Sequence, residues 1–293
     1  MKKNCPRAPR IREDGLPFKR ALGQHFLNDR ILLASLVAST GVTKADNVLE
    51  IGPGSGMLTA CLCEAAGRVW AVEVDESLIP FLRAALAPYP NAVIIQGDIR
   101  RLPLQDVCAP MGHGFFVIAN IPYHLTSPIL DLLLGSKLPI RQASVMVQRE
   151  VAEKMLAAPG EKGYGVLSLK VQYYCEPSVA AHVPAAAFAP PPKVDSAFVN
   201  LPFRQAPPWP TADEGLLFRL VKAGFGQRRK TLANALRGTL PLGMAELRDI
   251  LTELGLPAAV RGEALSLREW ISFANRCWRD MGEAKTSRDQ GFP

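Results

Sequence analysis

Short β-rich runs alternate with helix-like runs from about residue 30 onward, and this alternation constrains the fold more than any other feature. The β-rich runs are Asn47–Ile51, Arg68–Val74, Ala92–Gln96, Phe115–Ala119 and Ala143–Val147. The runs with helical spacing of apolar residues are Met57–Ala66, Ser77–Ala87, Ser127–Leu134 and Glu150–Ala157. Strands and helices in alternation are typical of a parallel sheet covered by helices on both faces. The sequence therefore predicts a doubly wound α/β domain.

The second half of the chain predicts a smaller helical domain. Ser178–Val183 and Ser196–Leu201 have the pattern of two further strands that can pair with each other. The proline-rich stretch 202–210 is typical of a linker, and the helical patterns beyond it are Glu214–Arg237, Met244–Leu254 and Ser266–Cys277. We therefore expect a basic N-terminal arm at 1–30, an α/β domain at 31–204, a helical domain at 205–283 and a frayed polar tail at 284–293.

The bulk properties exclude several classes of protein. With 293 residues and a net charge of +7, the chain can bury a full core and favours a polyanionic partner. No apolar run reaches the roughly 18 residues that a membrane span needs, and the basic N-terminus lacks the apolar core of a secretion signal, so we expect a cytoplasmic protein without membrane contact. The six cysteines form no C-x-x-C pair and the four histidines are scattered, so we expect reduced thiols and no metal.

A glycine-rich loop follows the first predicted strand and opens a helix. In Leu49-Glu50-Ile51-Gly52-Pro53-Gly54-Ser55-Gly56 the glycines permit unusual φ angles and let the backbone approach a ligand closely. The dinucleotide fingerprint G-x-G-x-x-G needs a glycine where this chain has Met57. The spacing therefore favours a mononucleoside ligand such as S-adenosylmethionine over a pyrophosphate, with Gly52 and Gly54 as cofactor-binding residues.

Two acidic residues at the ends of the next two predicted strands extend this cofactor site. Glu73 can accept hydrogen bonds from both ribose hydroxyls, as an acid about 20 residues beyond the loop does in dinucleotide folds. Asp98 can accept a hydrogen bond from the adenine amine of the cofactor. Taken singly, each is equally typical of a solvated loop. Their joint position at successive strand ends, where open α/β sheets bind ligands, favours the cofactor-binding role.

The tetrapeptide Asn120-Ile121-Pro122-Tyr123 follows the fourth predicted strand and has the parts needed to methylate an exocyclic amine. Asn120 offers an amide oxygen that can accept a hydrogen bond from an N–H, and Pro122 removes a competing backbone donor. Tyr123 offers an aromatic face on which a flipped-out base can stack. The alternative is an ordinary strand-to-turn exit, since asparagine and proline are common in turns.

A run of basic residues without an acid predicts an RNA-binding surface in the helical domain. Its members are Arg219, Lys222, Arg228, Arg229, Lys230 and Arg237. Such a patch supplies salt-dependent affinity for phosphates, with RNA shape supplying the selection. The candidates for RNA contact are Lys222, Arg228, Arg229 and Lys230, with further contacts from the basic N-terminal arm. The alternative is a solvated helical face.

The sequence resembles the ribosomal RNA adenine N6,N6-dimethyltransferases of the KsgA/RsmA family over nearly its whole length. The segments that carry the resemblance are Lys19–Leu27, Glu50–Gly56, Glu73, Gly97-Asp98, Asn120–Tyr123, Gln148–Glu150, Phe188–Ser196, Phe225–Leu232 and Arg261–Ser266. The resemblance implies a Rossmann-like methyltransferase sheet that uses S-adenosylmethionine to dimethylate two adjacent adenosines. These lie in the hairpin near the 3′ end of 16S rRNA, in the small ribosomal subunit or its precursor, and are modified late in assembly.

The resemblance also implies roles for particular residues, and we expect a monomer. The implied cofactor contacts are His25, Leu27, Gly52, Glu73, Asp98 and Asn120, with residues 1–30 containing a lid motif over the cofactor. Several relatives have asparagine in place of His25, so we expect it to act through its backbone or as a generic polar group. Phe188 resembles the family's second aromatic residue, which sandwiches the target base opposite Tyr123. The alternative for Phe188 is a core phenylalanine.

Two other functions stay open. Large-subunit rRNA methyltransferases of the antibiotic-resistance type share the Asn-Ile-Pro-Tyr sequence and the glycine loop, but Phe188–Ser196 and Phe225–Leu232 favour the small-subunit family. A non-catalytic nucleic-acid-binding or assembly factor on the same fold is the other alternative. The presence of Asn120, Glu73 and the loop glycines argues against it.

Overall fold

The computed structural model describes residues 10–11, 17–18, 25–112 and 114–289 of the chain. The chain divides into two compact units, of which the first comprises residues 1–152 and 177–203 and the second comprises residues 153–176 and 204–293. The sequence-based division instead kept 153–176 in the α/β domain. Most of the expected basic arm lies outside the described residues, which include only 10–11, 17–18 and 25–30 of it.

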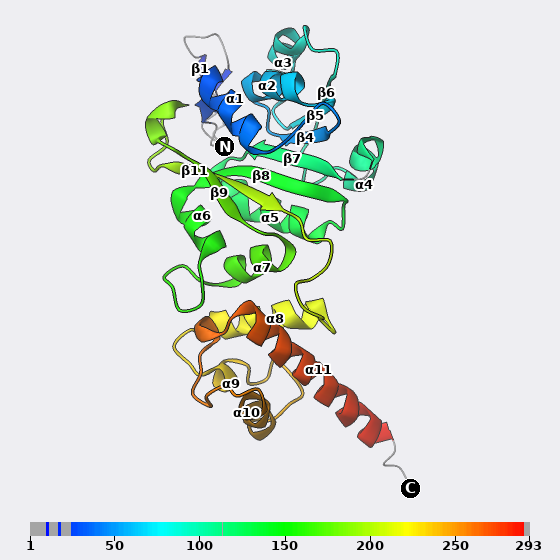
Figure 1. Ribbon diagram of the computed structural model, residues 1–293, viewed down its shortest axis with the longest axis vertical. Helices are drawn as coiled ribbons and strands as arrows, with labels where there is room; N and C mark the ends of the chain where they lie inside the picture. The colour runs from blue at the N-terminus through cyan, green and yellow to red at the C-terminus, as the bar shows by residue number, and fades with distance from the viewer. Residues whose placement is uncertain (1–9, 12–16, 19–24, 113, 290–293) are drawn as a thin grey trace, which may run out of the picture. The chain divides into compact units, whose positions relative to one another are not determined.

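The first unit contains a seven-stranded sheet in the order β6-β5-β4-β7-β8-β11-β9 (Figure 1). Five strands run parallel: β4 (Asn47–Ile51), β5 (Arg68–Glu73), β6 (Ala92–Gln96), β7 (Phe115–Asn120) and β8 (Ile140–Gln148). β11 (Ser196–Pro202) is antiparallel to β8, and β9 (Ser178–Val183) is antiparallel to β11. The expected strands and the pairing of the last two are therefore confirmed, and the sheet is mixed at one edge.

Helices cover both faces of this sheet, as expected for a doubly wound fold. α1 (Arg30–Ser39) and α2 (Met57–Ala65) pack their apolar side chains against Val48, Val69 and Ile118 of the central strands. α3 (Ile79–Leu86) lies on the same side, whereas α5 (Thr126–Gly135) lies on the other (Figure 1). The central strands are buried on both faces, which explains their nearly continuous apolar sequence.

The strand order reverses between β4 and β7, which are direct neighbours. The connections leaving their carboxyl ends diverge to opposite faces of the sheet, and this divergence opens a crevice where doubly wound folds bind ligands. The glycine loop follows β4 and the asparagine tetrapeptide begins at the last residue of β7. The topology therefore brings these two motifs together.

A second, two-stranded pairing lies beside this crevice. β3 (Phe26–Leu27) is antiparallel to β10 (Phe188–Ala189), with Phe188 opposite Leu27. The pairing holds the segment that starts at His25 in place, and His25 adds a hydrogen bond of 2.7 Å from its Nδ1 to the carbonyl of Pro190. The N-terminal side of the crevice is therefore fixed by residues that follow much later in the sequence.

The second unit is helical and is built around the fully buried Trp270. Its helices are α7 (Val166–Tyr174), α8 (Glu214–Gly226), α9 (Leu232–Ala235), α10 (Met244–Glu253) and α11 (Leu267–Asp289). Segment 153–176 joins this unit because Tyr164, Leu169 and Tyr173 pack into the same apolar cluster. The chain crosses between the units at 152–153, 176–177 and 203–204, and of these three crossings the last falls inside the expected proline-rich linker.

Two expectations for the helical unit were wrong. The continuous helix expected over Glu214–Arg237 ends at Gly226, and the chain turns before α9 begins at Leu232. Glycines at positions 224 and 226 weaken the helix there, and a turn closes with a hydrogen bond of 2.9 Å from the Lys230 N–H to the Gln227 carbonyl. In contrast, α11 runs on to Asp289, through residues expected to form a frayed tail.

No helix in the described part of the chain is long and apolar enough to span a membrane.

Candidate active site

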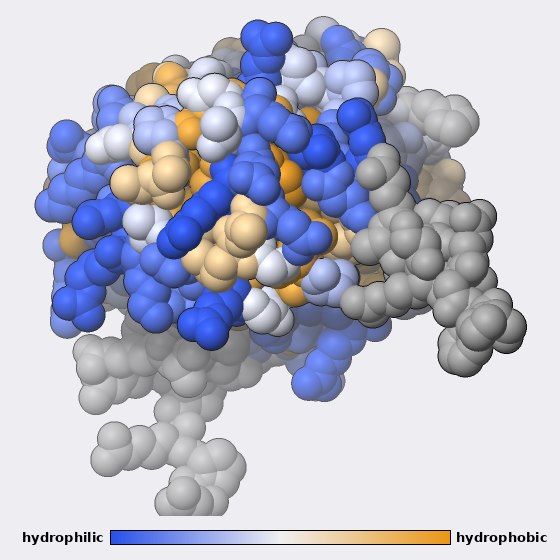
Figure 2. Space-filling view, turned by 90° about the horizontal axis from the view of Figure 1, so that it is seen from below, coloured by the Kyte–Doolittle hydropathy of each residue, from blue (hydrophilic) through white to orange (hydrophobic). Residues whose placement is uncertain are grey.

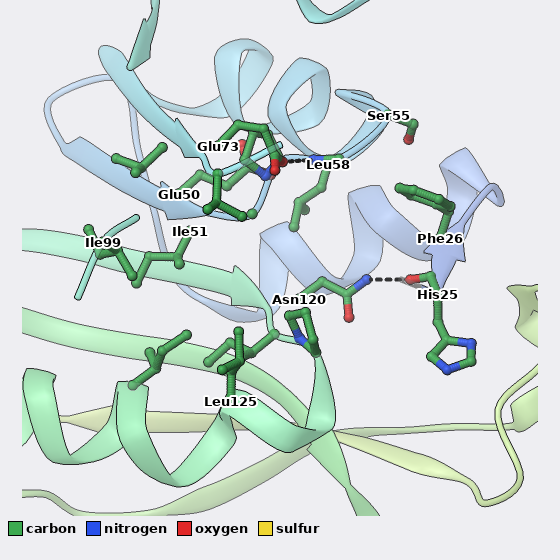
Figure 3. A pocket seen from close by; sticks show the side chains of 18 of the residues that line it. His25, Phe26, Glu50, Ile51, Ser55, Leu58, Glu73, Ile99, Asn120 and Leu125 are labelled. Atoms are coloured by element: carbon green, nitrogen blue, oxygen red, sulfur yellow. Dashed lines mark hydrogen bonds between the residues drawn. The ribbon is translucent and has the colours of Figure 1, made fainter. Parts of the chain in front are cut away.

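A cavity of about 330 Å³ lies at the carboxyl ends of β4, β5 and β7 (Figure 3). Volumes from about 300 Å³ upward are typical of small-molecule sites. Its lining includes eight residues that the sequence singled out: His25, Leu27, Gly52, Gly54, Glu73, Asp98, Asn120 and Tyr123. Segments that are distant in the sequence therefore converge on one site, as the positions at strand ends predicted.

The glycine loop brings backbone close to the cavity in conformations that other residues rarely adopt. Gly52 and Gly54 have φ angles of 73° and 56°. A Cβ on Gly54 would also lie 2.6 Å from a ring carbon of Phe26, so the loop and β3 meet with no room for a side chain. The Gly54 N–H donates to Glu73 Oε2 at 3.1 Å. The loop is therefore held against both the N-terminal wall and the acid of the second strand.

Glu73 is buried at the end of β5, with only 3% of its surface exposed. Its Oε1 accepts a hydrogen bond of 2.8 Å from the Asp75 N–H, in addition to the bond from Gly54. Burial raises the pKa of Glu73, and the backbone hydrogen bonds partly oppose this rise. Each carboxylate oxygen keeps a further lone pair, so Glu73 can still accept hydrogen bonds from two hydroxyls in the cavity.

Asp98 carries an ion pair that the sequence did not predict. Arg100 donates from Nε to Oδ1 at 2.9 Å and from Nη2 to Oδ2 at 2.7 Å. The Arg100 side chain lowers the pKa of Asp98, against a smaller opposing effect of burial. Asp98 is therefore a fixed, ionised acceptor, and both residues line the cavity.

Asn120 is oriented by the N-terminal wall of the cavity. Its Nδ2 donates to the carbonyl of His25 at 3.0 Å (Figure 3). Among the described residues no donor contacts its Oδ1, which is left as an acceptor for a group in the cavity. His25 thus acts through its backbone carbonyl. Because this carbonyl binds the amide nitrogen of Asn120, the amide oxygen is directed to the cavity even without a ligand.

Tyr123 is held at both ends. Its hydroxyl forms a hydrogen bond of 2.6 Å with Ser196 Oγ, and its ring stacks on His25 with centroids 5.8 Å apart and planes 25° apart. This separation is that of two rings in direct contact, so a base inserted between them requires His25 to move aside. The face of Tyr123 that His25 covers is available to a base only with such a displacement.

Phe188 does not line the cavity. Only 3% of its surface is exposed, and it packs in the apolar cluster with Leu27, Leu33 and Phe198. In this structure Phe188 is therefore a core residue, which pairs with β3 and packs against Leu27 in the apolar cluster. The aromatic ring facing Tyr123 is that of His25 instead, so the predicted sandwich of Tyr123 and Phe188 is not formed.

Glu50, the second-last residue of β4, is a cavity residue whose role the sequence did not suggest. It is fully buried, and neither carboxyl oxygen has a hydrogen-bond partner among the described residues. Figure 3 shows its position beside the cavity. The signal was present in the sequence, because a carboxylate interrupts an otherwise apolar strand, but the residue also belongs to the glycine motif.

The basic residues of the helical unit differ from one another. Arg228 donates from Nη2 to the Tyr164 carbonyl at 2.9 Å and its guanidinium lies 5.4 Å from the centre of the Phe225 ring. Within the described residues, no hydrogen bond or ion pair engages the side chains of Lys222, Arg229 or Lys230. Hydrophilic residues dominate the face of this unit in Figure 2, with smaller apolar patches among them. Arg228 therefore stabilises its own loop, whereas the side chains of Lys222, Arg229 and Lys230 remain available to bind anions.

The described residues contain no group of three or more histidine, cysteine or acidic side chains that could hold a metal ion.

Comparison with known proteins relates the chain to enzymes that modify ribosomal RNA. The family described as ribosomal RNA adenine dimethylase matches residues 15–275. The ribosomal RNA small subunit methyltransferase A of Lachnoclostridium phytofermentans is 43% identical, covering 88% of this chain and 91% of its own. That of Clostridioides difficile is 38% identical, covering 90% and 92%.

Solved structures share the fold over a similar extent. A dimethyladenosine transferase from Plasmodium falciparum superposes with a TM-score of 0.76 at 24% identity, covering 88% of this chain and 98% of its own. The 23S rRNA methyltransferase ErmE gives a TM-score of 0.68 at 26% identity, covering 86% and 99%. Together with the family match over most of its length, these likenesses show that the chain belongs to the ribosomal RNA adenine dimethylase family.

Proposed function

We propose that this chain transfers methyl groups from S-adenosylmethionine to N6 of two adjacent adenosines near the 3′ end of 16S rRNA, dimethylating each. The observation that carries the proposal is the oriented amide of Asn120, whose nitrogen is held by His25 and whose oxygen faces the cavity. The name shared by the curated relatives supports the small subunit as the source of the substrate. Such a substrate implies a cytoplasmic enzyme acting on the subunit or its precursor late in assembly.

The cavity fits the proposed cofactor by charge as well as by size. S-adenosylmethionine combines a nucleoside with two cationic groups, the sulfonium and the ammonium, and one carboxylate. The cavity is lined by three acids, Glu50, Glu73 and Asp98, and by Arg100. Glu73 would accept the ribose hydroxyls and Asp98 the adenine amine, while the Gly52–Gly54 backbone passes close to the ligand. His25 and Leu27 would close the N-terminal side. Glu50, with two unpartnered oxygens, supplies a site for positive charge.

The residues at the mouth of the cavity would orient the acceptor amine rather than deprotonate it. Adenine N6 is a poor nucleophile because its lone pair is delocalised into the ring. Hydrogen bonds from its N–H groups to Asn120 Oδ1 and to a nearby main-chain carbonyl would hold the nitrogen with its lone pair directed at the methyl group. Positioning of this kind contributes several kcal/mol to catalysis. The base would stack on Tyr123 after His25 moves aside.

The bound cofactor supplies a methyl group on a positively charged sulfur, which is an activated donor without further catalysis. The methylated nitrogen is acidic and loses its proton to water. Asn120 and Tyr123 therefore need only to bind and orient the base.

Binding of the RNA would depend on the exposed cations of the helical unit. Lys222, Arg229 and Lys230 are the candidates for phosphate contacts, with Arg228 shaping the loop that presents two of them. Contacts of this kind fall steeply with salt and carry little sequence information. The RNA hairpin would then be selected by its shape.

The alternatives have weaker support. The large-subunit enzyme ErmE shares the fold but is only 26% identical to this chain, against 38–43% for the small-subunit relatives. A non-catalytic role gives no reason for an oriented Asn120 amide, a tight glycine loop and three acids around one cavity.

The test uses S-adenosylmethionine labelled in the methyl group, with undermethylated small subunits and large subunits as separate substrates. Mass spectrometry of the digested RNA should locate dimethyladenosine only in the small subunit, in two adjacent positions. Asn120→Ala should lower turnover by about 10²–10³-fold, the cost of removing one oriented hydrogen-bonding group, while cofactor binding persists. Asn234→Ala, on the surface of the helical unit, is the matched control. Methylation of large subunits alone, or near-normal turnover by Asn120→Ala, would contradict the proposal.

A further inference from the structure

Glu50 stands out among the buried acids because nothing in the described structure balances it. Its surface is fully buried and both oxygens lack a hydrogen-bond partner. Thr59 Oγ1 on α2, which interacts with Glu50, is itself buried and has no hydrogen-bond partner of normal geometry among the described residues. An uncompensated buried carboxylate costs so much that the group either stays protonated or is matched to a cation.

The surroundings of Glu50 keep it protonated in the cofactor-free protein. Burial raises its pKa to about 8, the charge of Glu73 on β5 adds to the rise, and Thr59 opposes it. The other titratable groups that act on it are the buried thiols of Cys61 and Cys63 on α2. None of these groups is a cation. Two described cations lie near α2, and neither pairs with Glu50: Lys44 donates from Nζ to the carbonyls of Cys63 and Ala66 at 3.0 and 3.2 Å, and Arg30 pairs with Glu64.

The cavity beside Glu50 is the proposed binding site for a ligand that carries positive charge. We propose that Glu50 releases its proton when this ligand binds, so that cofactor binding is coupled to proton release. The inference rests on the proposed function for the identity of the ligand. It adds the role of Glu50 as a carboxylate generated on binding, which faces the cationic part of S-adenosylmethionine.

The proton balance fixes how binding depends on pH. Free protein with Glu50 as the carboxylic acid takes up the cationic ligand, the O–H bond breaks, the proton passes to the buffer, and the carboxylate stays against the cation. Below the pKa of about 8, binding should strengthen about tenfold per pH unit, and above it the dependence should disappear. The number of protons released should be about 0.9 near pH 7 and about 0.1 near pH 9.

Isothermal titration calorimetry in buffers of different ionisation enthalpy counts these protons directly. S-adenosylmethionine is titrated into wild-type protein and into Glu50→Gln, which has nearly the same shape but cannot ionise. The ammonium group of the free ligand titrates identically in both experiments, so the proton content of the unbound ligand cancels in the comparison. Near pH 7 wild type should release close to one more proton than the variant. Equal proton release by the two proteins would overturn the inference, and so would proton uptake by wild type.

Two analogues identify the cation and need only wild-type protein. S-adenosylhomocysteine keeps the ammonium but lacks the sulfonium charge, and 5′-methylthioadenosine lacks both. Proton release with S-adenosylhomocysteine assigns Glu50 to the ammonium, whereas release with S-adenosylmethionine alone assigns it to the sulfonium. Release with 5′-methylthioadenosine near pH 7 refutes the inference, even if Glu50→Gln fails to fold. Absence of any binding of S-adenosylmethionine instead refutes the proposed function, so the two failures are distinguishable.

Discussion

Replacing Glu50 by glutamine should make the cofactor-free protein increasingly stable relative to wild type as the pH rises. The folded-state pKa of Glu50 is about 8, well above the ordinary value of 4.5 that it regains on unfolding. Between these two pKa values the folded protein holds a proton that the unfolded chain has lost. The stability of wild type therefore falls as the pH rises, because unfolding lets the carboxyl group ionise in water.

The magnitude follows from the two pKa values. Each pH unit between them changes the free energy of unfolding by about 1.4 kcal/mol, and integration from about pH 5 to about pH 8 gives a loss of about 3 to 4 kcal/mol. Glu50→Gln carries no such ionisation. The variant's free energy of unfolding, minus that of wild type, should therefore rise by this amount over the same range. A constant offset from the change in side chain does not affect the slope.

Urea unfolding of both proteins, followed by circular dichroism at several pH values without cofactor, measures this difference. Glu64→Gln is the control, because Glu64 is exposed and the hydroxyl of Tyr89 and the guanidinium of Arg30 lower its pKa. The free energy of unfolding of Glu64→Gln should show no such rise relative to wild type as the pH increases. A difference between Glu50→Gln and wild type that stays constant with pH would show that Glu50 ionises freely in the folded state, and the reasoning from burial would fail.

Two further predictions concern the glycine loop and the basic loop. Gly54→Ala should lower cofactor affinity by about tenfold or more, because its Cβ would press on the Phe26 ring beside the cavity. Gly41 has a similar φ of +75°, but a Cβ there would meet no atom within 4 Å, so Gly41→Ala should lose stability and keep its cofactor affinity in calorimetric titrations. Equal affinity of wild type, Gly54→Ala and Gly41→Ala would contradict the role given to Gly54. Arg228→Ala should lower the free energy of unfolding by about 1 kcal/mol through loss of its hydrogen bond and ring contact. Arg229→Ala should leave the free energy of unfolding unchanged but reduce the slope of log binding constant against log salt concentration by about one. A loss of stability in Arg229→Ala, or a changed salt slope without loss of stability in Arg228→Ala, would contradict these assignments.

Much of the fold followed from local patterns in the sequence. The central strands, the glycine loop and the asparagine tetrapeptide are each specified within about ten residues, and parallel topology then brings their ends together. The contacts that decide how the site works are non-local. The hydrogen bond from Asn120 to the His25 carbonyl and the stacking of His25 on Tyr123 join segments about a hundred residues apart, which periodicity cannot indicate.

The differences between the expected and the observed positions have the same origin. Phe188 was expected at the target base because the resemblance gave its position in a motif but not which way its ring points, and pairing of β10 with β3 turns it into the core. The helix expected through Arg228 ends at Gly226, because two glycines weaken it there, and the spacing of apolar residues alone does not indicate this end. Glu50 was treated as part of a loop motif, whereas its burial depends on α2 and β5 packing around it.

The pairing of β3 with β10 has a consequence for the order in which the site can form during synthesis. Residues 25–27 leave the ribosome early, but their partner strand at 188–189 is made only after the chain has passed through segment 153–176 of the other unit. A nascent chain that stops short of β10 has the glycine loop and Asn120 but nothing to pair with β3. The wall that orients the Asn120 amide is thus completed late, after the strands and the glycine loop that form the rest of the cavity have been made.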